Sequence, residues 1–369
     1  MNASLPQTES ETSLGEGAKT VGWPRLSVIV PAHNAGLHLS RCLEALRTCG
    51  YTPFEVIVVD DCSTDNTRQI AERYGARCVR TPQMMGPGGA RNLGVRHAGG
   101  EIVVFVDADV VIPPDALRAI AEEFKRDPEL AGVFGSYDEA PAWSDFLSQY
   151  KNLMHHYVHQ ISSECAVTFW AGCGAMRKEV FEEFGGFDAQ KYSKPSIEDI
   201  ELGFRVTQAG RRIRLSKRLQ VKHLKRWTVG GLLRADIFYR AVPWTKLILK
   251  TGRLPRDLNL THGSRVSAGL AGLLVLAAVA LGLRAAGVIE WVSAGELLGL
   301  LAVLVVLLLG LNWRVYAFFR RRRGWRFAAG AVLAHWCYYF YSGVVFVLCW
   351  AAHYLRAPFA DRRAEQKRR

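Results

Sequence analysis

The sequence predicts an α/β domain followed by an interfacial amphipathic stretch and a group of transmembrane helices. Three features of the 369-residue chain indicate this order. Short β-branched runs alternate with helical segments up to about residue 227, a basic amphipathic stretch covers 227–250, and long apolar runs follow residue 259. The length suits one large domain with an accessory part. We therefore expect a leader at 1–24, the α/β domain at 25–226, interfacial helices at 227–260, a membrane region at 261–355 and a basic tail at 356–369.

The first part of the α/β domain alternates strands and helices. We expect strands at 26–31, 54–59, 76–80 and 101–106, with helices at 37–49, 66–74 and 89–98 between them. This alternation is typical of a mostly parallel sheet that is covered on both faces. Ligands of such sheets bind beyond the carboxyl ends of the strands, so the residues that follow each strand are candidate site residues.

The second part of the domain has a weaker alternation. A helix with aromatic and histidine side chains is expected at 143–160, and a strand of small residues at 169–176. A helix at 197–208 begins with two acids and precedes Gly210, a suitable residue for ending it. Short strands are expected at 213–215 and 220–223.

The apolar runs at 266–283, 297–311 and 327–354 predict three membrane spans, since a span takes about 20 apolar residues. Basic residues flank these runs at Arg320–Arg323 and Lys367–Arg369, as the positive-inside bias predicts. The net charge of +13 is therefore explained by a membrane, and nucleic acid is not an expected partner. The number of spans conflicts with this bias at one point. Three crossings would export the basic tail, whereas two would keep it in the cytosol. We expect three, with the tail outside.

The eight cysteines show no zinc-site spacing and no CxxC pair, which indicates reduced thiols in a reducing compartment. Residues 1–19 are polar and lack an apolar core, so we expect a disordered leader and not a signal peptide.

Acidic residues follow two of the expected strands. Asp107-Ala108-Asp109 places two carboxylates where both can reach a hard divalent cation and its bound diphosphate. A single such motif also occurs in ordinary solvated turns. Here, however, a second pair of acids, Asp60-Asp61, follows another expected strand. Those two acids have the chemistry to accept hydrogen bonds from a nucleobase and a ribose. The next glycine-rich turn runs into a helix that carries Arg91, an arrangement that suits an anionic ligand as well as an ordinary turn.

Two later motifs complete the candidate site. Glu198-Asp199 opens a helix, where acids are common because of the helix dipole, and a carboxylate there can also take a proton from an attacking hydroxyl. His223 lies three residues before Arg226 and Trp227. Arg226 has the charge to offset a leaving diphosphate, and Trp227 has a ring to pack against a sugar.

Taken together, these residues resemble the family 2 glycosyltransferases, inverting nucleotide-sugar enzymes of GT-A fold. The resemblance covers about residues 26–227 and rests on motifs in the family's order: 28–34, Asp60-Asp61, 89–92, Asp107-Ala108-Asp109, 185–188 and Glu198-Asp199. The His223-x-x-Arg226-Trp227 segment resembles the QxxRW motif of the membrane-bound branch, with His in place of Gln. That difference, together with only three expected spans, argues against a self-contained polymer channel.

The resemblance implies a role for each matching residue. Asp199 would be the general base, and the metal, Mg or Mn, would be bound by Asp109 and Asp107, with His223 as a further candidate ligand. Glu198, Arg226 and Trp227 would lie on the acceptor side. The donor, a UDP-sugar, would be bound by Pro31, Ala32, Asn34, Asp60, Asp61, Arg91 and Asp107.

The resemblance further implies a multi-pass protein of the cell (inner) membrane whose catalytic domain is cytosolic and whose acceptor is lipid-linked or a glycan. Two alternatives stay open: a processive polysaccharide synthase subunit, and a nucleotide-binding scaffold without catalysis. A dehydrogenase is disfavoured because no GxGxxG follows the first strand.

Overall fold

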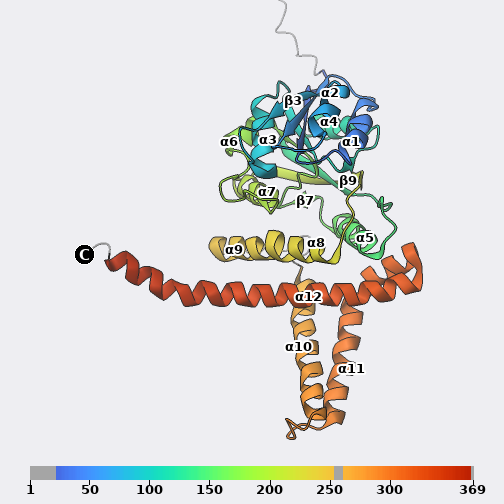
Figure 1. Ribbon diagram of the computed structural model, residues 1–369, viewed down its shortest axis with the longest axis vertical. Coiled ribbons are helices and arrows are strands. Elements are labelled where there is room, and N and C mark those ends of the chain that lie inside the picture. Colours follow the sequence, from blue (N-terminus) through green and yellow to red (C-terminus); the bar gives the residue numbers. More distant parts are fainter. Residues whose placement is uncertain (1–21, 253–260, 367–369) are drawn as a thin grey trace, which may run out of the picture.

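An α/β domain sits on a layer of helices, from which a helical hairpin projects (Figure 1). The computed structural model describes residues 22–252 and 261–366, with side chains up to Leu355. Residues 1–21 of the expected leader at 1–24 and residues 367–369 of the expected basic tail lie outside the described residues.

A mixed sheet forms the centre of the domain, in the order β3-β2-β1-β4-β8-β6-β9-β5, with β7 paired to β9. Strands β3 to β4 are parallel, whereas β8 is antiparallel to both β4 and β6. The prediction of a mostly parallel sheet is therefore right for the first part of the domain, on which it rests, and in the second part β6 and β9 are a further parallel pair. The strands are β1 (Leu26–Ala32), β2 (Phe54–Asp60), β3 (Arg77–Arg80), β4 (Ile102–Val106), β5 (Val110–Val111), β6 (Leu130–Tyr137), β7 (Cys165–Ala166), β8 (Cys173–Arg177) and β9 (Arg212–His223).

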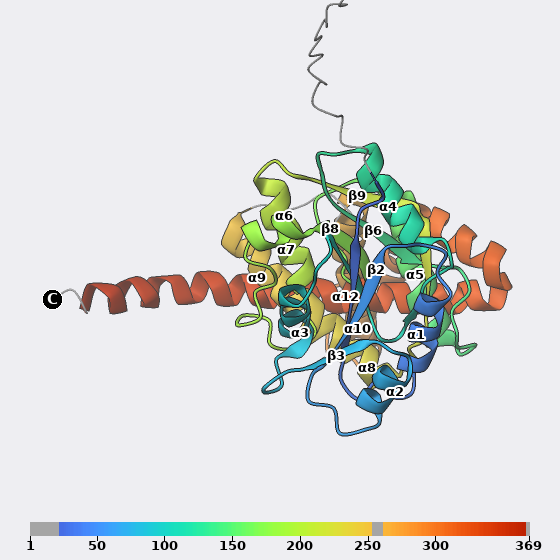
Figure 2. The same ribbon diagram turned by 90° about the horizontal axis from the view of Figure 1, so that it is seen from above.

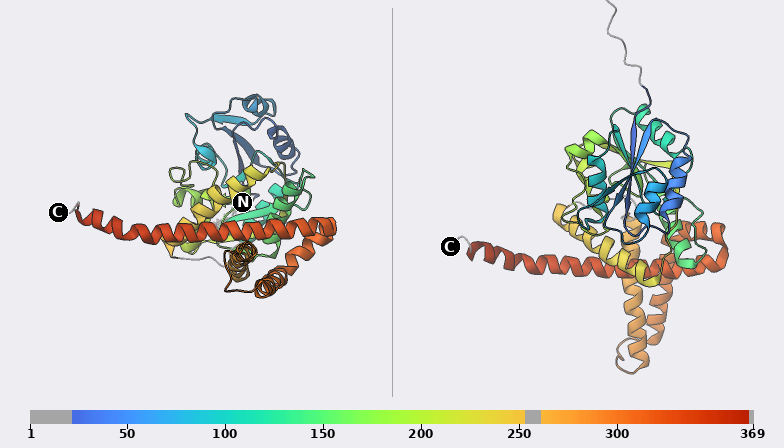
Figure 3. Two further views of the ribbon diagram at one scale, coloured as in Figure 1. Left: turned by 60° about the horizontal axis from the view of Figure 1, so that its bottom comes forward. Right: turned by 45° about the horizontal axis from the view of Figure 1, so that its top comes forward.

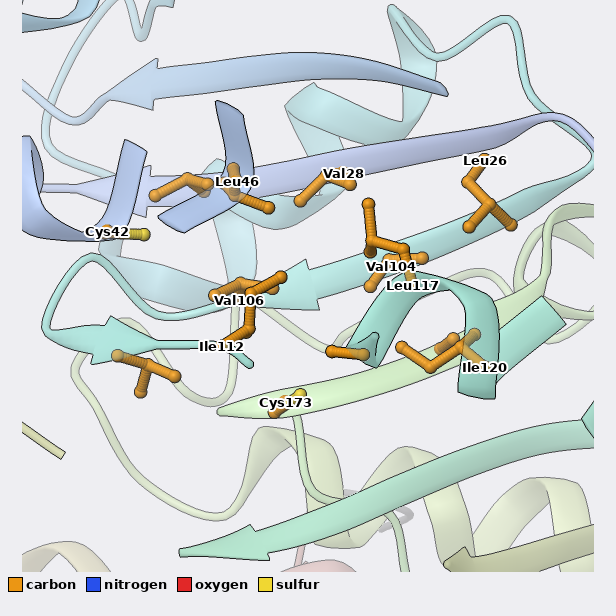
Figure 4. Packing of buried hydrophobic residues seen from close by; sticks show 14 of the residues in the cluster. Leu26, Val28, Cys42, Leu46, Val104, Val106, Ile112, Leu117, Ile120 and Cys173 are labelled. Atoms are coloured by element: carbon orange, nitrogen blue, oxygen red, sulfur yellow. The ribbon is translucent and has the colours of Figure 1, made fainter. Parts of the chain in front are cut away.

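Helices cover both faces of this sheet, as the sequence predicts (Figure 2). One face packs against α1 (Leu39–Arg47), α2 (Thr67–Arg73) and α4 (Ala116–Arg126), and the other against α3 (Gly86–Arg96), α6 (Lys178–Glu183) and α7 (Glu198–Gln208). Strand side chains alternate between two buried clusters: Val28 and Val104 belong to the first, shown in Figure 4, and Ile29 and Phe105 to the second. Helix α5 (Phe146–Ile161) lies at the lower end of the domain.

One long strand, β9, replaces the two short strands expected at 213–215 and 220–223. Its pairing with β6 shifts register between Phe134 and Ser136, so the irregular middle of β9 reads in the sequence as a loop.

The amphipathic stretch is a continuous helical segment made of α8 (Val229–Arg234), a π-helical segment η1 (Ala235–Ala241) and α9 (Val242–Thr251). Pro243 lies in the first turn of α9 and has no N–H to donate to the preceding turn. A wider π-helical turn just before it is consistent with that missing hydrogen bond.

In the part of the chain that the structure describes, three further helices are long and apolar enough to cross a membrane, as the three apolar runs predict. They are α10 (His262–Ala285), α11 (Ala294–Leu311) and α12 (Trp313–Gln366). Helix α12 is interrupted at Gly324, whose φ of 82° is non-helical. Helices α10 and α11 lie side by side as a hairpin, and the long part of α12 runs at a right angle to them (Figures 1 and 3).

Candidate active site

A cavity of about 590 Å³ opens at the carboxyl ends of β1, β2 and β4. It is closed on its other sides by α5, the start of α7, the end of β9, and the segment formed by η1 and α9. Most of the residues that the sequence selects line it, from elements far apart in the chain. They are Pro31, Ala32, Asn34, Asp61, Arg91, Asp107, Asp109, Glu198, Asp199, His223 and Trp227.

Strand pairing brings Asp109 and His223 together. Val110 of β5 is the antiparallel partner of His223 in β9, and the Leu224 N–H donates to the Asp109 carbonyl at 2.8 Å. As a result, the Asp109 Oδ2 lies 3.5 Å from the His223 Nε2. Burial alone would raise the pKa of Asp109, but the contact with His223 outweighs it and lowers that pKa. Asp109 is therefore held as an anion at the cavity wall.

Arg91 is buried and joins two of the predicted acids. Its guanidinium donates to the Asp107 Oδ1 at 2.6 Å and to the Glu198 Oε1 at 3.0 Å, so it links α3, the end of β4 and the start of α7. Arg91 lines the cavity, but its one positive charge is shared between these two acids, and its role in direct binding of an anionic donor stays a prediction. Arg91 also fixes the positions of Asp107 and Glu198.

Asp199 sits beside this ion-pair network. Its Oδ2 accepts from the Ala171 N–H at 3.0 Å and its Oδ1 from the Ile200 N–H at 2.8 Å, which orients the carboxylate at the start of α7. Burial raises the pKa of Asp199 to about 7, and the adjacent Glu198 carboxylate adds to the rise. A carboxylate with a pKa near neutrality is suited to general base catalysis.

The two acids after β2 have different surroundings. The Asp61 carboxylate lines the cavity and accepts from the Met85 and Gly86 N–H groups at 2.8 Å, and so stabilises the start of α3. Asp60 does not line the cavity; it accepts from the Ser63 N–H of its own loop at 2.9 Å. The predicted donor role of Asp60 is therefore not supported. Neighbouring residues at a strand end point to opposite sides, so the Asp61 side chain faces the cavity and the Asp60 side chain does not.

Asn34, after β1, has a left-handed backbone with a φ of 49°. Its side-chain Oδ1 accepts from the Thr64 N–H at 2.8 Å, and its own N–H donates to the Ser63 Oγ at 2.9 Å. It therefore joins the loops that follow β1 and β2, next to the end of β1, from which Pro31 and Ala32 line the cavity.

The segment after β9 differs from the prediction in one residue. Arg226 points away from the cavity, with its side chain 62% exposed, and its guanidinium lies over the Trp143 ring at 5.1 Å. Lys225 lines the cavity instead, with its Nζ 4.4 Å from the centre of the Trp227 ring. In an extended segment, residues two apart share a side, so Lys225 follows His223. That alternation was the available sequence signal for Lys225.

An aromatic wall that the sequence did not single out completes the cavity. Tyr137 stacks on the His223 ring at 4.2 Å with an interplanar angle of 9°, and His155 and Trp170 also contact Tyr137. Burial lowers the pKa of His159 to about 4 and that of His155 well below its usual value, so both rings are neutral. The spacing of His155 and His159 on one face of an expected helix was the signal.

The Asp109 and His223 pair fits a divalent cation. Two ligand atoms on one ion with bonds of about 2.1 Å lie roughly 3.0–3.5 Å apart, comparable to the separation observed. The described residues contain no group of three or more His, Cys, Asp or Glu side chains placed to bind a metal. Mg²⁺ sites often use one or two protein ligands together with substrate phosphates and water, so a pair is sufficient.

The α/β domain is similar in sequence to known glycosyltransferases. Residues 27–185 match the family model "Glycosyl transferase family 2". A poly(ribitol-phosphate) beta-N-acetylglucosaminyltransferase, TarS of Staphylococcus aureus, is 40% identical over 104 residues, 26% of this chain and 18% of TarS. The chondroitin synthase of Escherichia coli is 33% identical over 115 residues, 30% of this chain and 17% of the synthase. The chain thus matches less than a fifth of the length of these two relatives.

The fold is also shared with a solved enzyme. The mannosyltransferase PcManGT from Pyrobaculum calidifontis, solved with GDP-Man and Mn²⁺, has a TM-score of 0.56 and 21% sequence identity; the match covers 88% of this chain and 89% of that one. Residues 27–185 are thus similar in sequence to the family 2 glycosyltransferases, and the α/β domain has a GT-A-like fold.

Proposed function

We propose that this chain is a membrane-anchored, inverting glycosyltransferase. It transfers a sugar from a nucleoside diphosphate sugar to a lipid-linked or glycan acceptor, and a UDP-sugar is the donor that we propose. The observation that carries the proposal is the presence of Asp61, Asp109 and Asp199 around one cavity, at the carboxyl ends of the parallel strands.

The donor half of the cavity is formed by the loops after β1, β2 and β4. Asp61 offers carboxylate oxygens near the nucleoside, and Asp109 with His223 would hold a divalent cation, Mg²⁺ or Mn²⁺. When bound, such an ion offsets the negative charge of the leaving diphosphate. Lys225, on the same side as His223, adds a positive charge to this region.

Asp199 acts on the acceptor. It accepts the proton of the acceptor hydroxyl as that oxygen forms a bond to the sugar C1, while the bond from C1 to the diphosphate oxygen breaks on the opposite face. One displacement of this kind inverts the configuration at C1. The backbone N–H groups of Ala171 and Ile200 hold the Asp199 carboxylate in place, and its raised pKa gives it the basicity for this step.

The acceptor half lies toward the apolar helices. Trp227, Arg240 and Trp244 line it, the last two from η1 and α9, and α12 contacts both of those elements. An acceptor attached to a lipid would therefore find the cavity close to the membrane. The domain itself would lie on the cytosolic face of the cell membrane, where nucleotide sugars are made.

The test is a donor panel on the detergent-solubilised full chain. UDP- and GDP-sugars are offered with Mn²⁺ or Mg²⁺ and a lipid-linked glycan acceptor, and release of the nucleoside diphosphate is measured. We expect release with at least one donor, its loss in excess EDTA, and its loss in Asp199→Asn with donor binding retained. Binding of no donor would contradict the proposed function, and full activity in EDTA would contradict the metal.

A further inference from the structure

The third apolar helix has an unexpected direction. Residues 327–355 of α12 contain the apolar run and extend roughly 44 Å at about 1.5 Å per residue, more than the about 30 Å of a bilayer core. This part of α12 runs at a right angle to the α10–α11 hairpin and beneath the α/β domain (Figures 1 and 3). Two helices of one protein that lie at a right angle cannot both follow the membrane normal.

The beginning of α12 is bound to the lower end of the α/β domain. The Arg323 Nε donates to the Gln149 Oε1 at 2.6 Å, and the Arg322 guanidinium forms an ion pair with Glu139 at 2.6 Å. These contacts fix the start of the apolar run at the level of α5.

The middle of α12 is bound at the same level. The Tyr341 hydroxyl donates to the Asp236 Oδ2 at 2.8 Å, and the buried Asp236 forms an ion pair with Lys151 of α5 at 2.6 Å. Tyr341 lies about 24 Å of helix beyond Trp325, the first residue after the interruption at Gly324. A helix crossing the membrane from Trp325 would carry Tyr341 that far from the domain, out of reach of Asp236.

The hairpin meets α12 at its end nearest the domain. The Tyr339 hydroxyl donates to the Asn312 Oδ1 at 2.8 Å, and the Asn312 amide donates to the Ser267 Oγ at 3.0 Å. Asn312 directly follows α11, and Ser267 lies near the start of α10. Both ends of the hairpin therefore lie at the level of Tyr339, and its tip lies farthest from the domain (Figure 1).

The two sides of α12 have different surroundings. Ala328, Ala331 and Tyr339 are buried against the rest of the protein, at spacings that place them on one side of the helix. On the other side, Leu333 and Leu348 are each 63% exposed. An exposed apolar stripe of this length, continuous with a membrane hairpin, is suited to contact with lipid.

We propose that only α10 and α11 cross the membrane, and that α12 lies along the membrane surface on the side of the α/β domain, with lipid covering its exposed apolar stripe. This arrangement is independent of the reaction. It keeps the basic residues that follow Leu355, such as Arg356 and Arg362, on the same side as Arg320–Arg323. The positive-inside bias is then satisfied at each segment, whereas three crossings would violate it at the last one.

Two epitope insertions in the full chain test the topology. One tag follows Gly287, in the exposed connection between α10 and α11, and the other follows Arg369. In spheroplasts, whose outer envelope has been removed, we expect an antibody to reach the Gly287 tag, and to reach the Arg369 tag only after the inner membrane is permeabilised. Every other combination overturns the proposal, including access to both tags from outside, which three crossings predict.

A depth measurement tests the position of α12 itself. A nitroxide probe is attached to Leu333→Cys or to Phe340→Cys, at the middle of the apolar run, in the full chain with the native cysteines replaced by serine. Its depth in the bilayer is read from quenching by lipid-bound and water-soluble relaxation agents. A surface helix gives equal, shallow depths for both positions. A spanning helix places Phe340 near the bilayer centre, about 10 Å deeper than Leu333, and that result overturns the proposal.

Discussion

The pH dependence of transfer should report the ionisation of Asp199. Because its pKa is raised to about 7, the carboxylate is about one-tenth ionised at pH 6 and about nine-tenths ionised at pH 8. Only the ionised form accepts a proton, so activity should be present above pH 7 and be lost as the pH falls through it. We expect kcat/KM for the acceptor, at saturating donor, to rise about tenfold from pH 6 to pH 8.

Changing the neighbour of Asp199 makes this prediction specific. Glu198→Gln removes the negative charge that helps to raise the pKa of Asp199, and it also leaves Arg91 with one acidic partner fewer. Both effects favour the ionised form of Asp199, so the fall in activity should move to lower pH. Glu201→Gln is the matched control, because Glu201 lies on the same helix but is paired with Arg205 outside the cavity.

The assay is the initial rate of nucleoside diphosphate release from pH 5.5 to pH 8.5 for the unchanged chain and its Glu198→Gln, Glu201→Gln and Asp199→Asn variants. The reasoning is refuted if kcat/KM is flat over this range, if Glu198→Gln leaves the profile in place while Glu201→Gln moves it, or if Asp199→Asn turns over at the normal rate.

Three more predictions follow from the contacts of the site. Asp109→Ala should lower kcat about a hundredfold or more, about 2.7 kcal/mol of barrier, and weaken Mn²⁺ binding measured by titration; unchanged Mn²⁺ affinity would exclude Asp109 as a ligand. Arg91→Met should cost about 3–5 kcal/mol of stability by leaving buried acids unpaired, a fall of roughly 6–20 °C in Tm, which Arg91→Lys should partly restore. Lys225→Ala should raise the donor KM while Arg226→Ala leaves it unchanged, and the reverse order would contradict the placement of both side chains.

The sequence predicts the elements of the domain well because their signals are local. The strands before His33, Asp61 and Asp107 are apolar, β-branched and end in polar residues, and the structure has them as β1, β2 and β4. The directions of the later strands were not predictable in this way. Whether β8 runs parallel or antiparallel to β4 depends on how the chain returns to the sheet, and no local pattern records that path.

The candidate site was predictable to within about one residue. Adjacent acids such as Asp60 and Asp61 share a strand end, and only the phase of the strand decides which of them faces the cavity. The same alternation makes Lys225 face the cavity and Arg226 point away from it. The aromatic wall around Tyr137 was less accessible, because it depends on the packing of α5 against β6 and β9, which is a tertiary contact.

Arg91 binds one acid from each of two acidic pairs and leaves the other acid of the pair to a different partner. It binds Asp107 from the pair after β4 and Glu198 from the pair at the start of α7. The other acid of each pair lies beside a different group: Asp109 beside His223, and Asp199 beside the backbone N–H groups of Ala171 and Ile200. The buried Arg91 side chain therefore links the proposed donor side, at Asp107, to the proposed acceptor side, at Glu198. Its single positive charge offsets part of the negative charge of Asp107 and Glu198, and it leaves Asp109 and Asp199 for the diphosphate and acceptor roles that we propose for them.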